Sequence, residues 1–132
     1  MKKKIAILGS TGSIGTTSLN IFKKNKNKFD IILLAANRNY SLICKQIKLF
    51  KPKYYIISNK LVFKKVEKKF KNKKIHIFND FSDLNFKKKK FDITISSIVG
   101  IAGLSPTIKF VKYTKKISLA NKETIICGWH LI

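Results

Sequence analysis

Three glycines near the start of the chain have the spacing of a loop that binds nucleotide phosphates. Gly9, Gly12 and Gly15 stand between a short apolar run and a run with helical periodicity. In such a loop the first glycine allows a tight turn, the second lets the backbone approach a pyrophosphate, and the third lets the helix pack closely on the strand. Glycines also serve ordinary turns. Here the glycines follow a predicted strand and open a predicted helix, and this context favours phosphate binding over an ordinary turn. Three hydroxyl side chains could add donors: Ser10, Thr11 and Ser13.

The segment that ends the second apolar run indicates which nucleotide would bind. In NAD-binding loops of this kind, an acidic residue about 20 residues further on bonds the 2′-hydroxyl of the ribose. This chain has Asn37, Arg38 and Asn39 there, and no carboxylate stands between Ala35 and Glu67. Arg38 is the one arginine beside 28 lysines, and a guanidinium pairs well with a 2′-phosphate. The segment therefore favours NADP over NAD, with an ordinary surface cation as the alternative interpretation of Arg38.

Two later segments place glycines and polar side chains after predicted strands. Gly100 and Gly103 follow the fifth of these strands, which suits either a backbone that passes close to a cofactor or a plain turn. Asn121, Lys122 and Glu123 follow the last one, at the edge of the sheet where ligands bind. Asn121 could bond the nicotinamide ribose or carboxamide, Lys122 a substrate phosphate or hydroxyl, and Glu123 the cofactor or the N–H groups of a following helix.

Alternating strands and helices are predicted to position these residues. The predicted strands cover residues 4–8, 30–36, 54–58, 75–78, 91–97 and 117–120. The predicted helices cover residues 13–24, 40–50, 60–71 and 106–114, and residues 79–90 predict a loop with one helical turn. Ser41 is the expected N-cap of the second helix and Ser105 that of the fourth, with Pro106 as its first residue. This alternation predicts one α/β domain over residues 1–132, a Rossmann-like doubly wound parallel sheet with helices on both faces.

The charge of the chain is strongly positive, +23 from 29 Lys and Arg against 6 Asp and Glu. Such a balance is typical of nucleic-acid-binding proteins. The lysines are spread over nearly every segment, however, and an evolved phosphate-binding face usually includes arginine. We attribute the charge to a general bias toward surface lysine. Because no apolar run approaches the roughly 18 residues that span a bilayer, we expect a cytoplasmic protein without membrane or nucleic-acid partners.

The cysteines and histidines do not form a metal-binding pattern. Cys44 and Cys127 lie far apart without metal-type spacing, and we expect two reduced thiols. His76 falls in a predicted strand and His130 near the end of the chain. We expect both histidines to be structural or incidental.

Four segments agree in order and spacing with one enzyme family. They are ILGSTGSIG, AANRN, SIVGIAGLSPT and LANKE, at residues 7–15, 35–39, 97–107 and 119–123. Together they resemble the 1-deoxy-D-xylulose-5-phosphate reductoisomerases. Other dehydrogenases with this glycine loop, such as aspartate-semialdehyde dehydrogenase, lack a downstream LANKE. The resemblance implies an NADPH-dependent oxidoreductase that rearranges and reduces 1-deoxy-D-xylulose 5-phosphate to 2-C-methyl-D-erythritol 4-phosphate, in the non-mevalonate route to isoprenoids.

The resemblance also implies roles for residues, by position. The implied cofactor-binding residues are Gly9, Thr11, Gly12, Ser13, Ile14, Gly15, Asn37, Arg38, Asn39, Asn121 and Glu123. Lys122 is the implied substrate contact, and the complete enzyme is implied to be a homodimer that needs a divalent cation, Mg or Mn. The family usually has glycine and then lysine where Asn37 and Arg38 stand. Asparagine tolerates a left-handed backbone better than most residues, and arginine keeps the charge.

The resemblance further implies what residues 1–132 do not contain. The acidic residues that hold the metal in the family lie shortly after LANKE, beyond Ile132. We therefore expect no metal ligand and no catalytic residue within the chain, and we expect the 132-residue chain to bind NADPH without turnover. The alternatives are a non-catalytic NADPH-binding module or truncated relic, a lysine-rich nucleic-acid-binding protein, and another oxidoreductase with the same loop type.

Overall fold

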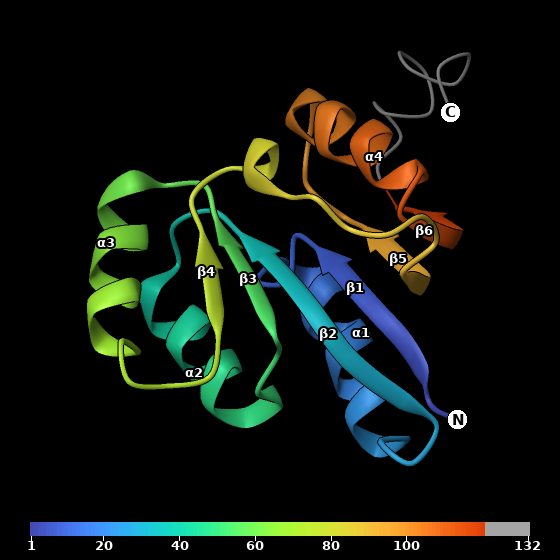
Figure 1. Ribbon diagram of the computed structural model, residues 1–132, viewed down its shortest axis with the longest axis horizontal. Helices are drawn as coiled ribbons and strands as arrows, with labels where there is room; N and C mark the ends of the chain where they lie inside the picture. The colour runs from blue at the N-terminus through green and yellow to red at the C-terminus, as the bar shows by residue number, and fades with distance from the viewer. Residues whose placement is uncertain (121–132) are drawn as a thin grey trace.

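A sheet of six parallel strands lies at the centre of the structure, a computed structural model that describes residues 1–120 (Figure 1). The strands are β1 (Lys3–Leu8), β2 (Phe29–Ala36), β3 (Tyr54–Ile57), β4 (His76–Phe78), β5 (Phe91–Ser96) and β6 (Thr114–Leu119). Their order across the sheet is β4-β3-β2-β1-β5-β6, and each neighbouring pair is parallel. The chain thus builds outward from β1 and then returns to add β5 and β6 on its other side. This confirms the predicted doubly wound sheet and places its switch point between β1 and β5.

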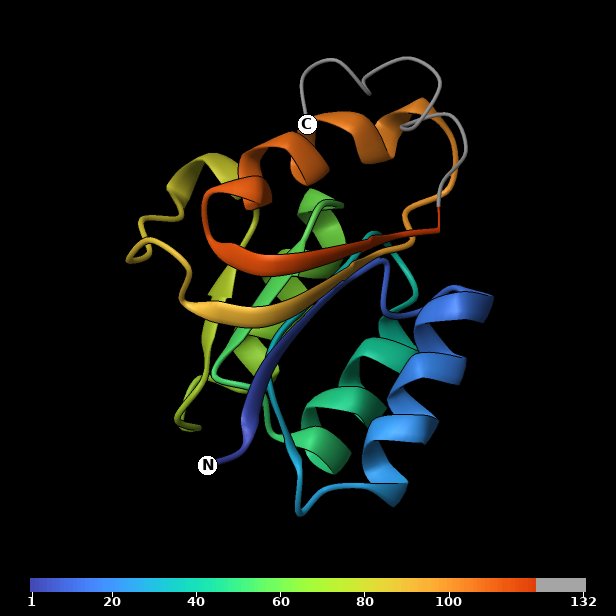
Figure 2. The same ribbon diagram turned by 90° about the vertical axis from the view of Figure 1, so that its right-hand side faces the viewer.

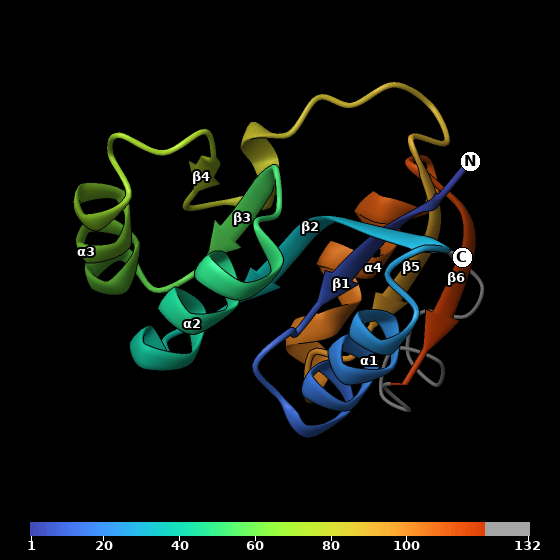
Figure 3. The same cartoon turned by 90° about the horizontal axis from the view of Figure 1, so that it is seen from below.

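Helices cover both faces of the sheet, as predicted. The helices are α1 (Ser13–Lys24), α2 (Tyr40–Phe50), α3 (Lys60–Lys69) and α4 (Leu104–Val111), with 3-10 turns η1 (Phe81–Asp83) and η2 (Ile101–Gly103). The first three pack on one face and α4 on the other. Figure 2 shows α4, in orange, on the opposite side of the sheet from α1 and α2, and Figure 3 shows the same layers from below. None of the helices in the described part of the chain is long and apolar enough to cross a membrane.

The strands hold an apolar core on each face because their side chains alternate between the two. On β1, Ile5 and Ile7 belong to the core under α1, α2 and α3. Ala6 and Leu8 belong to the core under α4, and all four side chains are fully buried. Strands covered on both faces read as continuous apolar runs, which is the reason the sequence located them well. The loops of the candidate site follow the carboxyl ends of these strands, so the two cores hold the sheet edge from which the loops start.

The N-cap of α2 differs from the prediction of Ser41. The Oδ1 atom of Asn39 accepts a hydrogen bond from Leu42 N at 3.3 Å, which makes Asn39 the cap. The Ser41 hydroxyl itself donates to Asn39 Oδ1 at 3.5 Å. A cap oxygen reaches the N–H two or three residues further on, so Asn39 serves a helix that begins at Tyr40, whereas Ser41 lies inside the first turn.

The segment around α4 also begins and ends earlier than predicted. Gly103, not Ser105, is the N-cap, so Pro106 is the third helical residue rather than the first. Proline is accepted there because the first-turn N–H groups have no partner within a helix. The Thr107 hydroxyl donates to the Gly103 carbonyl at 2.6 Å and also bonds Ser96 on β5, which ties the first turn of α4 to the sheet. The following strand, β6, already begins at Thr114, which the sequence had placed in the helix.

Asp92 joins three strands near the amino edge of the sheet, and its charge is expected to stabilise the fold. Its carboxylate accepts from Lys4 N of β1 at 2.8 Å and lies 3.0 Å from Lys115 Nζ of β6. These hydrogen bonds, first that from Lys4 N, lower the pKa of Asp92. A carboxylate with a lowered pKa stabilises the folded state above its unfolded-state pKa of about 4 and loses that contribution as the pH falls through the folded-state pKa.

The expected result for Asp92→Asn is therefore a stability loss of about 1 kcal/mol or less at pH 7 that shrinks below pH 4. Urea unfolding of the two chains between pH 3 and pH 7 measures the difference. A difference that stays constant over this range would contradict the assignment. Asp30→Asn is the matched control, since Asp30 forms no ion pair within residues 1–120 and its removal is expected to have little effect.

Candidate nucleotide-binding site

The glycine loop connects β1 to α1 at the carboxyl edge of the sheet, and two of its glycines are required by packing. Gly9 has φ +88°, and a Cβ atom there would lie 2.9 Å from backbone atoms of Ser97 and Ile98. A Cβ atom on Gly15 would lie 2.1 Å from the Gly9 carbonyl oxygen. Gly12 differs, because its φ is −78° and the nearest atom to an added Cβ is Gly9 O at 3.7 Å. The fold therefore needs Gly9 and Gly15, whereas Gly12 leaves open space in front of the loop.

The backbone of this loop presents N–H groups that nothing in the described chain uses. Gly9 N and Ser10 N both donate to the Ala35 carbonyl of β2, at 2.8 and 2.9 Å, which holds the start of the loop. Within residues 1–120, the N–H groups of Thr11, Ser13 and Ile14 donate to no protein acceptor. They lie at the amino end of α1, whose first turn has no acidic residue. Free N–H groups and a positive helix end together favour an anion such as a phosphate.

One hydroxyl that the sequence offered as a phosphate donor does not face the ligand side. Ser10 is fully buried. Its Oγ atom donates to Gln46 Oε1 at 2.8 Å and lies 3.0 Å from the Tyr55 hydroxyl. The prediction for the Ser10 hydroxyl is therefore wrong, because the loop turns this side chain into the core. Thr11 and Ser13 keep free hydroxyls, since neither forms a side-chain hydrogen bond within the described residues.

A cleft of about 290 Å³ opens in front of the loop. It lies at the carboxyl ends of the strands and spans the switch point between β1 and β5. The lining residues come from the end of β2, from the loops after β1, β2, β3 and β5 and from both 3-10 turns: Gly9, Thr11, Gly12, Ala35, Ala36, Asn37, Ser58, Phe81, Ser97, Ile98, Val99 and Ala102. Open α/β sheets bind ligands in this position. The fold thus brings the glycine loop and the end of β2 to one cavity, as the sequence predicted.

The segment after β2 contributes one residue to the cleft, and an exposed cation follows that residue in the sequence. Asn37 lines the cleft, and Arg38 is exposed and has no acidic partner within residues 1–120. Asn39 uses its Oδ1 atom to cap α2, which leaves its Nδ2 hydrogens as donors. Asn37 does not adopt a left-handed backbone, since the non-glycine residues with positive φ in the described chain are Lys51 and Lys89. The expected conformational reason for asparagine at position 37 is therefore wrong.

Ser97, which the sequence did not single out, holds the loops after β1 and β5 together. Its Oγ atom donates to Leu8 O at 3.0 Å and lies 3.2 Å from Gly9 O. The next residues, Val99 with 87% of its surface exposed and Gly100 with φ +76°, belong to the same loop. The sequence does not predict this role for a serine that follows an apolar strand. Its partners are backbone carbonyls that lie near it only once the sheet has formed.

Comparison with known families decides what kind of chain this is. The family model of 1-deoxy-D-xylulose 5-phosphate reductoisomerase matches residues 5–128. The chain belongs to this family. A reductoisomerase of Pelagibacter ubique is 47% identical over 133 residues, and one of Thermodesulfovibrio yellowstonii is 42% identical over 130 residues. Each match covers 98% of this chain and 34% of the relative, so the chain spans about a third of the length of the curated relatives it matches.

Solved reductoisomerase structures share the fold described above. The enzyme from Zymomonas mobilis in complex with NADPH superimposes with a TM-score of 0.88 at 26% identity, covering 99% of this chain and 35% of that chain. A reductoisomerase in complex with NADPH, fosmidomycin and magnesium superimposes with a TM-score of 0.82 at 28% identity, covering 94% of this chain and 31% of that chain. The sheet and its covering helices are thus those of the reductoisomerase family.

The last predicted site residues of this family member lie outside the described residues. These are Asn121, Lys122 and Glu123, and the same holds for Cys127 and His130. Ala120, the last described residue, lies beside the end of β5, because its N–H donates to Ser96 O at 2.9 Å. Ser97, the next residue of that segment, lines the cleft. Within residues 1–120, no three His, Cys, Asp or Glu side chains lie together as metal ligands would. We assign no cation ligand to this part of the chain.

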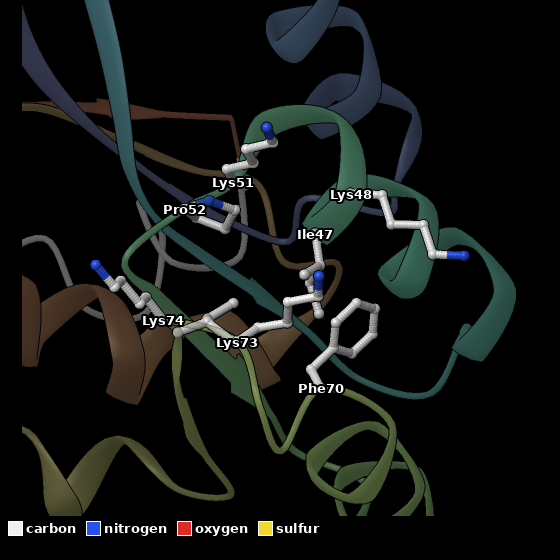
Figure 4. A pocket seen from close by; sticks show the side chains of 8 residues that line it. Ile47, Lys48, Lys51, Pro52, Phe70, Lys73 and Lys74 are labelled. Atoms are coloured by element: carbon white, nitrogen blue, oxygen red, sulfur yellow. The ribbon is translucent and has the colours of Figure 1, made fainter.

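A second hollow of the reductoisomerase domain, about 390 Å³, lies at the opposite edge of the sheet. It is lined by Ile47, Lys48, Lys51, Pro52, Phe70, Lys73, Lys74 and Ile75, which cluster where β3 and β4 begin (Figure 4). Although it is larger than the cleft, it lies at the carboxyl end of α2, where the helix dipole is negative. In Figure 4, Lys48, Lys51 and Lys74 extend away from its centre. We therefore do not assign the nucleotide site to this hollow, although it is larger than the cleft.

Proposed function

We propose that this chain is the NADPH-binding part, over residues 1–132, of an enzyme that converts 1-deoxy-D-xylulose 5-phosphate to 2-C-methyl-D-erythritol 4-phosphate. One observation carries the proposal: the N–H groups of Thr11, Ser13 and Ile14 at the amino end of α1 have no acceptor within residues 1–120, and Thr11 and Gly12 of the same loop line the cleft at the switch point of the sheet. Family membership supplies the reaction, and a related structure holds NADPH on the same fold. NADPH supplies the hydride for the reduction when it is bound.

The proposed contacts follow the geometry of the cleft. The N–H groups of Thr11, Ser13 and Ile14 bind the pyrophosphate, which can approach because Gly12 has no side chain. Arg38, with Asn37 and Asn39 beside it, binds the 2′-phosphate by a charge-assisted bond. For the residues that follow β6, the resemblance alone supports the assignment. Asn121 and Glu123 are proposed to contact NADPH and Lys122 the sugar phosphate.

The proposal extends to the complete enzyme, which we infer to be a cytoplasmic homodimer that uses a divalent cation. Magnesium in a related structure supports the cation. The metal ligands and the catalytic residues are proposed to belong to the part of the relatives that this chain does not span.

Cofactor binding by the 132-residue chain tests the proposal. We expect the fluorescence of NADPH to report saturable binding, and NADH to bind at least about tenfold more weakly because it lacks the 2′-phosphate that Arg38 would pair with. Because the net charge of +23 attracts any polyanion, the titration is repeated in 0.5 M salt with inorganic triphosphate as competitor. Equal affinity for NADPH and NADH, or binding that triphosphate abolishes at equal concentration, would contradict the proposal and favour a general polyanion-binding surface.

A further inference from the structure

A buried polar cluster connects the glycine loop to α2 and β3. It consists of Ser10, Gln46 and Tyr55, and no more than 3% of the surface of any of them is exposed. Gln46 Oε1 accepts hydrogen bonds from Ser10 Oγ at 2.8 Å and from Tyr55 Oη at 2.7 Å. Gln46 Nε2 donates to the backbone carbonyl of Ser10 at 2.8 Å. One amide group thus holds both the side chain and the main chain of a single loop residue.

The bond to the Ser10 carbonyl has a geometric consequence for the next residue. The peptide group that joins Ser10 to Thr11 is planar and trans, so its C=O and N–H point in opposite directions. Gln46 draws the carbonyl into the core. The Thr11 N–H must then point outward, and Thr11 lines the cleft. Within residues 1–120, no acceptor takes this N–H.

We propose that Gln46 is a positioning residue for the phosphate site, which orients the Ser10–Thr11 peptide so that the Thr11 N–H faces the ligand. The proposal rests on the proposed function, because it names the residue that sets up the phosphate donor. Tyr55 helps to hold the Gln46 amide in this orientation, because its hydroxyl donates to Gln46 Oε1. Burial raises the pKa of its hydroxyl, so the hydroxyl keeps the proton that it donates to Gln46 under all ordinary conditions.

The cluster offers variants that separate this bond from general core packing. Gln46→Met keeps the size of the side chain but removes its amide, and the affinity for NADPH is expected to fall about tenfold, as for the loss of one hydrogen bond to a charged group. Ser10→Ala and Tyr55→Phe keep the bond from Gln46 to the Ser10 carbonyl and are expected to cost about threefold at most. Phe91→Leu is the control for lost stability, because Phe91 is fully buried at the far end of β5. It is expected to lower the unfolding temperature without changing the affinity.

A second measurement reads the orientation of the peptide without any cofactor. Hydrogen exchange and the NMR shift of the Thr11 amide, followed in the free chain, are expected to change in Gln46→Met and to stay near the wild-type values in Phe91→Leu. Wild-type NADPH affinity in folded Gln46→Met, or an equal loss in Phe91→Leu, would overturn the positioning role. If the unmodified chain failed to bind NADPH, the proposed function would be wrong instead, and an unchanged Thr11 amide in Gln46→Met would then overturn the orientation separately.

Discussion

Gly15→Ala is expected to destabilise the chain by about 3 kcal/mol and to remove measurable NADPH binding. The added methyl group would lie 2.1 Å from Gly9 O, 2.8 Å from Ser10 Cα and 2.9 Å from Gly9 C. All three are backbone atoms of the loop, so no side-chain rotation can relieve the overlap. Either α1 must move away from β1 or the loop must change its course, and both changes displace the free N–H groups of the loop.

Gly12→Ala is the matched control for this prediction, because it changes the same loop by the same methyl group. Alanine adopts the φ of −78° at this position freely, and the new Cβ would be 3.7 Å from its nearest neighbour. We therefore expect the stability of Gly12→Ala to stay within about 0.5 kcal/mol of the unmodified chain. The methyl group occupies the space where the pyrophosphate would approach the backbone, so the affinity for NADPH is expected to fall at least about tenfold.

Urea unfolding and NADPH titration of both variants give the two quantities needed. The expected pattern is loss of stability and binding in Gly15→Ala, but loss of binding alone in Gly12→Ala. Unchanged NADPH binding in Gly12→Ala would show that the cofactor phosphates lie elsewhere. A fully stable Gly15→Ala chain would show that α1 does not pack on the loop as the structure has it.

Arg38→Gln is expected to weaken NADPH binding by about 10- to 100-fold and to leave NADH binding unchanged. Arg38 is exposed, follows the cleft-lining Asn37 and has no acidic partner in the described chain, so its guanidinium is available for a charge-assisted bond to the 2′-phosphate. NADH has no phosphate there. The ratio of the two dissociation constants is therefore the quantity that reports the role of Arg38.

Two further variants separate this specific bond from general electrostatic attraction. Arg38→Lys keeps the charge but loses the two-pronged geometry, and we expect an affinity for NADPH between those of the unmodified chain and Arg38→Gln. Lys64→Gln removes one charge from the exposed surface of α3 at a residue that does not line the cleft, and is expected to leave the ratio unchanged. If Arg38→Gln lowered NADPH and NADH binding equally, the 2′-phosphate would not be the partner of Arg38.

The glycine loop could be located from the sequence because its requirements are local. A turn with φ +88° at Gly9 and the contact between Gly15 and Gly9 O arise within seven residues. The buried strands could be located for a similar reason, since a strand covered on both faces is apolar throughout. The edge strand β6 is an exception. Its residues Lys115 and Lys116 are exposed, so its apolar signal began only at Ile117 and the sequence placed its start three residues too late.

Side-chain directions within the loop could not be read from the sequence. Serine at position 10 is suited to a phosphate site or to a core hydrogen bond. The choice depends on Gln46 and Tyr55, which are 36 and 45 residues away. In the same way, Asn39 and Ser41 are both good N-caps, and the path of the chain out of β2 decides between them. The residues adjacent in sequence therefore predict neither the direction of the Ser10 side chain nor the N-cap of α2.

The sequence by itself determined the class of fold, the position of the glycine loop and the cationic residue expected to select NADP. These depend on backbone freedom, apolar periodicity and charge, which are properties of neighbouring residues. Only the tertiary structure decided that the Ser10 hydroxyl lies in the core, how Ser97 and Gln46 hold the loop, and that the cleft lies between loops following four different strands. Those features depend on hydrogen bonds between residues that folding brings together from distant parts of the chain, so they exist only once the sheet has assembled.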